Sequence, residues 1–258
     1  MIKIRNLTFS YDTRTKPVLK NIHLEIKRGE FFGIIGPNGA GKTTLFKLLL
    51  GFLSPTKGSI EILGVPLKQM KRKEIAKNIS AVMQEFYPAY DFTVEEIVHL
   101  GRTPYLNMFS DESKEDCMMV KKALNETELD GFEEKLFNQL SGGEKQRVLI
   151  AKCFAQNTPI LLLDEFVAHL DIGHVQQLIK RVYKKNRNDG ITVVGIFHDI
   201  NIASLYCDRI AVLNDAQLET VGPPSEIINN SLLDTVYHAD SYIIQHKDDQ
   251  KPQIVLRK

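Results

Sequence analysis

The alternation of apolar and polar residues predicts that the chain begins with short strands. It runs through Ile2 to Ser10 and again through Val18 to Ile26, and turn-forming residues bound both segments. Phe31 to Ile35 is continuously apolar instead and ends at Gly36, which is typical of a parallel strand buried on both faces. Helical character follows from Thr43 to Leu50. Gly36 therefore opens a loop between a buried strand and a helix.

The rest of the chain alternates between helical and strand-like patterns. Glu74 to Met83 reads as a short helix and then a strand, and Thr93 to Gln156 is mostly helical with breaks near Pro104 and Ser141. Leu178 to Lys185 is an amphipathic helix. Three further apolar runs have the length of buried strands: Ile160 to Asp164, Thr192 to Phe197 and Ile210 to Leu213. Strands that alternate with helices imply a mostly parallel α/β core.

The composition is that of a globular protein. The 258 residues are 43% hydrophobic and 25% charged with a formal net charge of +1, so a packed core is available and the bulk charge does not indicate nucleic-acid binding. Cys117, Cys153 and Cys207 lie far apart, which argues against a disulfide framework or a zinc site and favours reduced thiols in the cytosol. No apolar run reaches the roughly 18 residues that cross a bilayer, and the N-terminus does not read as a signal peptide. Any membrane spans would therefore belong to another chain.

A glycine-rich loop, G-P-N-G-A-G-K-T-T, joins the first buried strand to its helix. It matches the phosphate-binding pattern G-x-x-x-x-G-K-[ST] in the required strand–loop–helix context. Glycines let the backbone approach a phosphate, and the helix N-terminus adds a positive partial charge. Lys42 is expected to neutralise the β- and γ-phosphates of ATP, and Thr43 is expected to ligate Mg²⁺.

A plain glycine turn would explain neither the lysine nor the threonine, so the pattern predicts that the protein binds and hydrolyses ATP. The predicted nucleotide-binding residues of this loop are Gly36, Pro37, Asn38, Gly39, Ala40, Gly41, Lys42, Thr43 and Thr44.

A second candidate element is the run I-L-L-L-D-E, from Ile160 to Glu165. Its apolar residues predict a strand that delivers two carboxylates to its C-terminal edge, where open α/β sheets bind ligands. Asp164 fits a partner of Mg²⁺, and Glu165 fits the residue that polarises the attacking water. By itself such a run is as typical of a strand that simply reaches solvent. The phosphate-binding loop upstream favours the functional interpretation.

The octapeptide L-S-G-G-E-K-Q-R, from Leu140 to Arg147, identifies a family. A serine and two glycines at a helix start offer a second set of anion-binding amides, although a plain helix cap can have the same residues. The octapeptide resembles the signature motif of the ABC ATPases, in which Ser141, Gly142 and Gly143 would contact nucleotide.

Four isolated residues match other family positions in order and spacing. Tyr11 resembles the aromatic residue that stacks on adenine, and Gln84 resembles the glutamine that touches Mg²⁺ and water and couples to a membrane subunit. His198 resembles the switch histidine that contacts the γ-phosphate, and Asp171 resembles the aspartate of the D-loop. Alone, each of them could be an ordinary surface or structural residue.

The segment after the second carboxylate departs from the family pattern. The family has E-P-T-S-x-L-D, whereas this chain has E-F-V-A-H-L-D. Phe166 replaces the proline, and Val167 and Ala168 replace the threonine and serine. Because both carboxylates and Asp171 are retained, we expect hydrolysis to be retained as well.

The resemblance implies an α/β fold, namely a P-loop NTPase (RecA-like) core with an N-terminal antiparallel β part and an inserted α-helical subdomain. It implies one ABC ATPase domain over residues 1–258, with residues 1–87 and 159–258 in the α/β core and residues 88–158 in the helical subdomain that carries the signature motif.

The resemblance also implies partners. Family members act as head-to-tail pairs, in which the phosphate-binding loop of one copy and the signature motif of the other enclose each ATP. The expected partners are therefore a second copy of the chain, transmembrane permease subunits and, indirectly, a substrate-binding protein, with no nucleic acid. The expected location is peripheral, at the cytoplasmic face of the cell membrane.

Two segments resemble the importers of iron chelates, haem and cobalamin. They are T-V-E-E-I-V-H-L-G-R-T-P-Y, from Thr93 to Tyr105, and L-L-D-T-V-Y-H-A-D, from Leu232 to Asp240. Importers of molybdate, zinc or manganese are close alternatives. A soluble ABC ATPase of DNA repair or of the ribosome fits less well, because only 99 positions separate Lys42 from Ser141 and no heptad pattern fills them. A P-loop kinase would not explain the signature motif.

Overall fold

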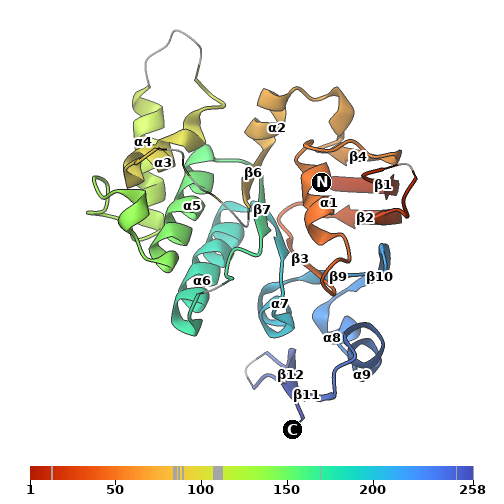
Figure 1. Cartoon of the computed structure of the whole chain (residues 1–258). Helices are drawn as coiled ribbons and strands as arrows, with labels where there is room; N and C mark the ends of the chain where they lie inside the picture. The colour runs from red at the N-terminus through yellow and green to blue at the C-terminus, as the bar shows by residue number, and fades with distance from the viewer. Residues whose placement is uncertain are drawn as a thin grey trace. The chain divides into compact units, whose positions relative to one another are not determined.

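A computed structural model describes residues 1–12, 14–83, 86, 88, 90–106, 113–168, 170–247 and 249–257. The contacts within the chain divide it into two compact units (Figure 1). The first unit consists of Met1–Met70 and Thr192–Lys258, and the second consists of Lys71–Ile191. The domain boundaries expected from the family resemblance remain a prediction.

An antiparallel sheet forms the N-terminal part of the first unit. Its strand order is β2-β1-β4-β5, and Ile4 of β1 faces Leu24 of β2 on one side and Ile60 of β4 on the other. All three side chains are buried, so the alternating pattern of the sequence places one face of this sheet in a core. The strands are β1 (Ile2–Phe9), β2 (Leu19–Ile26), β4 (Lys57–Ile62) and β5 (Val65–Pro66), and a 3-10 turn follows at Leu67–Gln69. This is the expected antiparallel β part.

Three parallel strands form the centre of the first unit. β3 lies between β8 and β9, with Ile34 opposite Ile196 on one side and Ala211 on the other. Every residue of β3 is buried, as its unbroken apolar run predicts. The strands are β3 (Phe31–Ile35), β8 (Thr192–Ile196) and β9 (Arg209–Asn214), and β10 (Gln217–Gly222) adds to β9 in the antiparallel sense.

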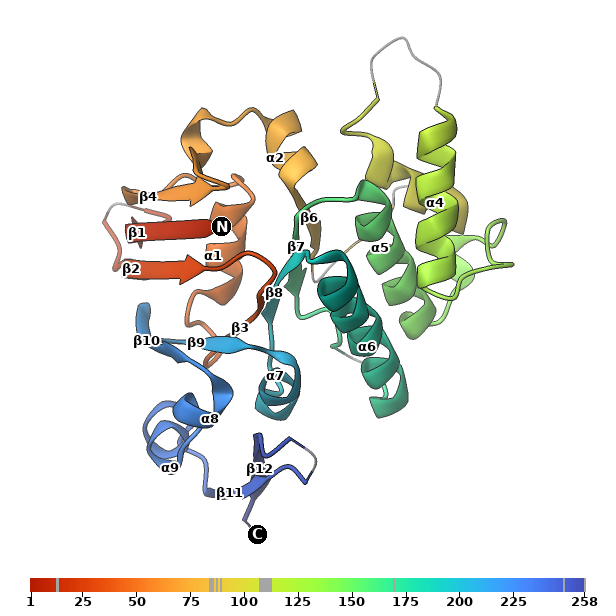
Figure 2. The ribbon, with the colours of Figure 1, turned by 180° about the vertical axis from the view of Figure 1, so that it is seen from behind.

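Short helices and a C-terminal hairpin complete the first unit, and both views show α1 beside the antiparallel sheet (Figures 1 and 2). These elements are α1 (Lys42–Leu49), α7 (Ile200–Tyr206), α8 (Pro224–Ile227), α9 (Asn230–Leu232), a π-turn (Leu233–Tyr237), β11 (Ser241–Gln245) and β12 (Pro252–Leu256).

The hairpin of β11 and β12 is bound to α7 by side chains. Both groups of the Asn201 amide bond to the backbone of Ile254, which donates at 2.7 Å and accepts at 3.1 Å. Ser204 donates to the carbonyl of Pro252 at 2.6 Å, and Lys251 donates to the carbonyl of Leu205 at 2.6 Å. The Asn201 amide thus pairs with the N–H and the C=O of one residue on the edge of β12, as a neighbouring strand would.

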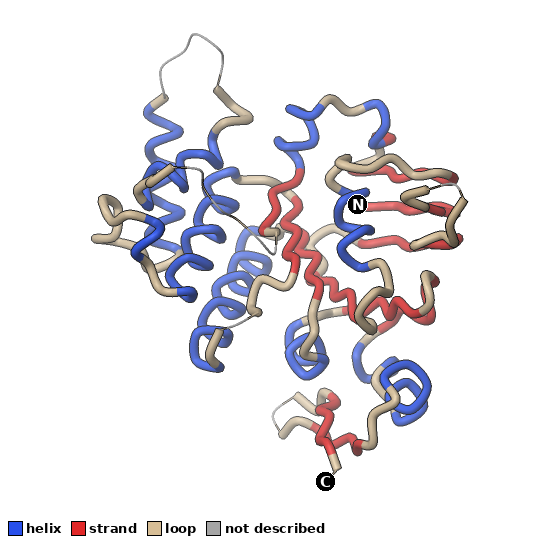
Figure 3. The backbone as a smooth tube through the Cα atoms, in the orientation of Figure 1, coloured by secondary structure: helices blue, strands red, loops and turns tan. Residues whose placement is uncertain are grey.

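The second unit is mainly helical (Figure 3). Its elements are α2 (Arg72–Asn78), β6 (Ile79–Val82), α3 (Val94–His99), a 3-10 turn (Leu100–Arg102), α4 (Lys114–Glu126), a 3-10 turn (Phe137–Gln139), α5 (Gly142–Gln156), β7 (Ile160–Asp164) and α6 (Ile172–Asp189). Strands β6 and β7 pair in parallel, and helices α3, α4 and α5 pack against one another.

A buried ion pair joins these three helices. Arg102, just after α3, donates to the carboxylate of Asp116 in α4 at 2.8 Å and to the carbonyl of Ala155 in α5 at 2.7 Å. Hydrogen bonds from Ser113 and Arg102 lower the pKa of Asp116 and keep it ionised. Among the residues described, no helix is long and apolar enough to cross a membrane.

Replacing Ser204 with alanine should lower the stability of the protein. The side chain is fully buried, and its loss would leave the Pro252 carbonyl without its 2.6 Å hydrogen bond. The carbonyl keeps its 2.9 Å bond from the Gln253 side-chain amide, so the loss is that of one buried hydrogen bond. Such a bond contributes about 0.5–1.5 kcal/mol, which should appear as a lower free energy of unfolding in urea. Ser241→Ala is the control, because its hydroxyl makes only a 3.4 Å bond to Ala239. Equal stability of the two variants would contradict the assigned role of Ser204.

Candidate functional site

The phosphate-binding loop follows β3 at the C-terminal edge of the parallel strands. Gly36, Gly39 and Gly41 all have positive φ, at 147°, 81° and 96°. A Cβ atom on Gly36 would lie 2.0 Å from the carbonyl oxygen of Leu213, and one on Gly41 would lie 2.7 Å from that of Val18. Only glycine fits at these two positions, so the glycines of the motif have a steric origin as well as a chemical one.

The lysine of the loop turns back over it. Lys42 is 5% exposed, and its ammonium donates to the carbonyls of Gly36 at 2.8 Å and Pro37 at 2.9 Å. These contacts keep a buried cation within a few ångströms of the loop backbone. Within the loop, Ala40 is buried, whereas Asn38 and Gly39 are exposed. Amides and an ammonium gathered on one loop suit a polyphosphate.

Tyr11 lies next to the start of α1, as its predicted role requires. Its hydroxyl is 3.2 Å from the hydroxyl of Thr44, and its ring packs edge-on against Phe9 with centroids 5.0 Å apart. The side chain is 61% exposed, so a ring face remains accessible. Thr43, the preceding residue, is half-buried at the first turn of the helix.

His198 leaves the sheet at the same edge as the loop. Ile34 and Ile196 are paired in the parallel register, and His198 follows Ile196 at the same interval at which Gly36 follows Ile34. Phe197 donates to the carbonyl of Ile34 at 3.1 Å, which extends this pairing by one residue. His198 is exposed. The structure thus brings this histidine and the phosphate-binding loop together on adjacent strands of one unit.

Tyr237 is a residue behind the loop whose role the sequence does not indicate. Burial raises the pKa of its phenol, and the backbone of Gly36 acts on the phenol in the opposite sense. The two groups do not meet the geometry of an ordinary hydrogen bond. Tyr237 belongs to the segment from Leu232 to Asp240 that resembles the chelate importers, and that resemblance was its only signal.

Two adjacent carboxylates lie at the end of β7 in the second unit. Asp164 ends the strand with no exposed surface, whereas Glu165 is half-buried and has a φ of 50°. A left-handed conformation costs a residue other than glycine on the order of 1–3 kcal/mol and is concentrated at functional sites. The strain turns the chain sharply after Asp164.

The predicted Gln84 lies outside the described residues. The strand before it, β6, pairs with β7 in parallel, with Val82 opposite Leu163. β6 therefore ends at the same edge as Asp164, which is where Gln84 was expected to be delivered.

Phe166 explains the departure from the family pattern in this segment. Its side chain is fully buried, and a turn closed by a 2.9 Å bond from the Ala168 amide to the Glu165 carbonyl surrounds it. Val167 and Ala168 are half-buried. A buried aromatic ring anchors the loop after the carboxylates, where the family has a stiff proline.

Ser141 begins α5 with a reciprocal cap. Its amide donates to the carboxylate of Glu144 at 2.8 Å, and its hydroxyl accepts from the Glu144 amide at 3.4 Å. Hydrogen bonds from the side chain and backbone of Ser141 lower the pKa of Glu144. Gly142 and Gly143 are the first two residues of the helix, so their amides have no intrahelical acceptor. This leaves two amides at a helix N-terminus that suit an anion.

Asp171 caps the start of α6. One carboxylate oxygen accepts from the His174 amide at 2.9 Å, and the other lies 2.7 Å from Nδ1 of the His174 ring. The backbone and side-chain hydrogen bonds from His174 lower the pKa of Asp171. Sequence reasoning identified the aspartate but not the histidine that it holds.

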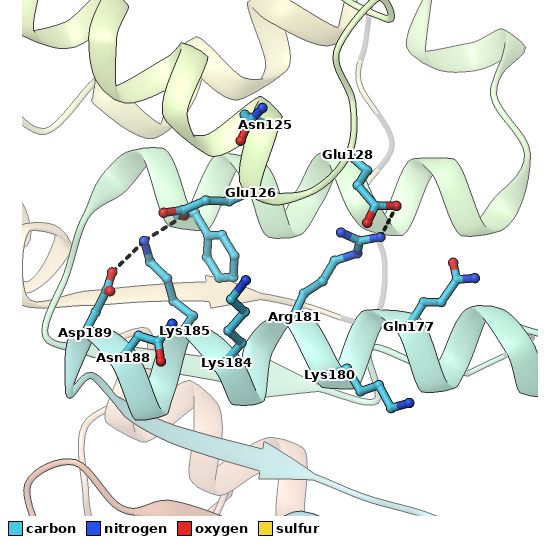
Figure 4. Close-up of a pocket in the computed structure, with 11 residues that line it drawn as sticks. Asn125, Glu126, Glu128, Gln177, Lys180, Arg181, Lys184, Lys185, Asn188 and Asp189 are labelled. Carbon is cyan, nitrogen blue, oxygen red and sulfur yellow. Dashed lines mark hydrogen bonds and ion pairs between the residues drawn. The ribbon is translucent and has the colours of Figure 1, made fainter.

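Two grooves lie within the second unit. The first has a volume of about 450 Å³, and in it Lys185 bridges Glu126 at 2.7 Å and Asp189 at 2.8 Å while Arg181 pairs with Glu128 (Figure 4). The second has a volume of about 690 Å³ and lies along α3, with Phe92, Leu100 and Leu106 among its apolar residues and Glu95, Glu96 and Glu134 among its charged ones. Neither groove contains a residue of the predicted nucleotide site.

Residues 19–168 match the family model described as ABC transporter. The chain belongs to this family. It is therefore an ABC ATPase that binds and hydrolyses ATP, and the expected P-loop NTPase fold is confirmed.

Curated ABC ATPases align with nearly the whole chain. It is 36% identical over 251 residues to the hemin import ATP-binding protein HmuV of Thermobifida fusca, covering 97% of this chain and 87% of that protein. It is 35% identical over 245 residues to the petrobactin import ATP-binding protein FpuC of Bacillus anthracis, covering 95% and 89%. It is 36% identical over 244 residues to the ABC transporter ATP-binding protein YvrA of Bacillus subtilis, covering 93% of this chain but only 54% of YvrA.

Solved ABC structures have the same fold. One is described as an inward-facing ABC transporter of the metal-chelate type, with a TM-score of 0.86, 25% identity and coverage of 100% of this chain and 97% of that one. Another is a dimer of the bacterial ABC transporter cassette MJ0796, with a TM-score of 0.76, 33% identity and coverage of 86% and 98%.

Replacing Phe166 with alanine should destabilise this ABC ATPase. The ring is fully buried, and removing such a ring costs about 3–5 kcal/mol through lost burial and the cavity left behind. The control restores the family residues next to it, Val167→Thr with Ala168→Ser, and should change the free energy of unfolding by less than about 1 kcal/mol, because both side chains are half-exposed. Thermal and urea unfolding measure both. A Phe166→Ala protein as stable as the control would show that the ring is not an anchor.

Proposed function

We propose that this ABC ATPase powers the import of an iron chelate, haem or cobalamin. The observation that carries the proposal is the likeness over nearly the whole chain to the hemin and petrobactin import subunits, together with the two sequence segments of that branch. The metal-chelate type of the similar transporter structure supports the same cargo. Loss of iron-chelate or haem uptake in cells that lack the gene, restored by the intact gene alone, would test the cargo.

The loop after β3 would hold the phosphates of ATP, with Lys42 turning from the loop carbonyls to the β- and γ-phosphates. Its ammonium already lies within 2.9 Å of the loop backbone, so the movement is short. Tyr11 would stack on adenine with its exposed face. His198, on the adjacent strand, would contact the γ-phosphate.

Thr43 and Asp164 suit Mg²⁺ as hard oxygen donors, and Gln84 would add a third. The described residues contain no cluster of three His, Cys, Asp or Glu side chains that could hold a metal. A Mg²⁺ site does not need such a cluster, because proteins bind Mg²⁺ through one or two carboxylates together with substrate phosphates and waters. The ion would offset charge on the phosphates.

Glu165 would polarise the water that attacks the γ-phosphate. Glu165 is half-buried whereas Asp164 is fully buried, so the two carboxylates have different surroundings and suit different roles. Proton transfer by a positioned carboxylate contributes about 10²- to 10⁴-fold to a rate.

A second copy of the chain would complete each site. Ser141, Gly142 and Gly143 would present the helix N-terminus of one copy to the ATP held by the loop of the other. The dimeric form of the similar cassette MJ0796 supports this arrangement. ATP would then close the dimer and hydrolysis would reopen it, so that the difference in binding free energy between the two states drives transport.

The permease would sit on the groove along α3. In the part of the chain that the structure describes, this groove has three glutamates and no lysine or arginine among its lining residues. Cytoplasmic loops of membrane proteins are enriched in lysine and arginine, so an acidic groove with apolar residues complements such a loop. The protein would then lie at the cytoplasmic face of the membrane, and a substrate-binding protein would act on the opposite side.

Glu165→Gln should leave ATP binding intact, lower the rate of hydrolysis by about 100-fold or more and accumulate an ATP-bound dimer. Turnover assays and gel filtration with ATP measure these effects. The companion variant Lys42→Ala should lose nucleotide affinity instead. A Glu165→Gln protein that hydrolyses ATP at the native rate would exclude Glu165 as the base, and unchanged turnover in Lys42→Ala would exclude the loop as the phosphate site.

Glu134→Lys should weaken the complex with the proposed permease, because it reverses an exposed charge in the groove. Glu219→Lys, an exposed reversal in β10 of the other unit, is the matched control. Co-purification from membranes at low and high salt measures the complex, and the deficit should shrink at high salt as charges are screened. Equal recovery of both variants at low salt would remove this groove as the docking surface.

A further inference from the structure

The signature motif and the D-loop touch within one copy of the chain. A Cβ atom placed on Gly143 would lie 3.0 Å from Cδ2, 3.2 Å from Cγ and 3.5 Å from Nε2 of His174. The imidazole therefore packs against the backbone of Gly143. The first turn of α6 thus lies against the first turn of α5, and both belong to the second unit.

Asp171 fixes the orientation of this imidazole. One of its oxygens accepts from the His174 backbone amide, and the other binds the ring through Nδ1 at 2.7 Å. A carboxylate that holds both the amide and the ring of one residue removes much of the rotational freedom of the side chain.

Gly143 carries one of the two amides that the helix leaves without an acceptor. The direction of these amides decides how well they can donate hydrogen bonds to an anion. A shift of the helix start by about an ångström would weaken those bonds considerably. The ring of His174 supports Gly143 on the side where a side chain would project, and a residue with a Cβ atom would collide with the ring there. Asp171, His174 and Gly143 therefore form one continuous contact.

We propose that His174 is a positioning residue that joins the signature motif to the D-loop, so that a second copy of the chain meets both motifs as one rigid surface. The inference rests on the proposed function, in which these motifs close over the partner's ATP. His174 acts through Gly143 and Asp171. The binding of ATP to the loop of its own copy does not involve it.

The test measures ATP-driven dimerisation in the Glu165→Gln protein, with Mg²⁺ present, by analytical ultracentrifugation. Adding His174→Ala should weaken dimerisation by about fivefold or more, which is the loss of roughly one hydrogen bond and its packing. The affinity of the separate monomers for ATP should stay within about twofold of that of the parent. A variant that failed to fold would lose this affinity as well, so the measurement separates a positioning role from a folding defect. His174→Asn, which keeps a donor at the position of Nδ1, should recover most of the dimer.

His23→Ala removes an exposed histidine of β2 in the other unit and is the control for a general effect of losing an imidazole. A His174→Ala protein that dimerises as tightly as its parent would overturn the inference, as would an equal loss of monomer ATP affinity. A parent that fails to dimerise with ATP at all would count against the proposed function instead. The two failures are therefore distinguishable.

Discussion

Gly36 holds the backbone of the phosphate-binding loop directly against the carbonyl of Leu213 on the neighbouring strand, so close that a Cβ atom would lie 2.0 Å from that oxygen. The contact sets where the chain leaves β3 and therefore where the loop amides and Lys42 lie. His198 depends on the same constraint, because its strand is paired with β3 in register. The phenol of Tyr237 is the other group that acts on the backbone of Gly36. The predicted phosphate site therefore depends on this one close approach.

In the second unit, the packing holds a buried charged residue and a residue with a strained backbone in place. Asp164 is fully buried and Glu165 has a left-handed backbone, and both conditions are unfavourable unless the surrounding structure compensates for them. The buried ring of Phe166 anchors the turn that contains the strain. The buried pair of Arg102 and Asp116 joins the helices that carry the signature motif. Stability in this unit is concentrated where it orients the groups of the site.

The periodicity of the chain was sufficient for most elements of the fold. The unbroken apolar runs before Gly36 and Glu165 became fully buried parallel strands, because only strands covered on both faces tolerate such runs. The C-terminal hairpin was less predictable, since its attachment depends on the Asn201 amide pairing with Ile254, 53 positions away. Likewise, no local pattern indicates that a buried phenol at position 237 lies behind a glycine at position 36.

The sequence by itself determined the family. It also predicted the phosphate-binding loop, the two carboxylates and the signature serine and glycines, because each of these is a local motif whose chemistry needs fixed residues at fixed spacing. Only the tertiary structure decided that His174 rests on Gly143, that Phe166 replaces a proline by being buried, and that His198 shares an edge with the loop. These relations depend on which segments pack together. Packing brings together residues that are far apart in the chain, and it depends on side-chain shape and strand register. Neither property can be read from the local order of amino acids.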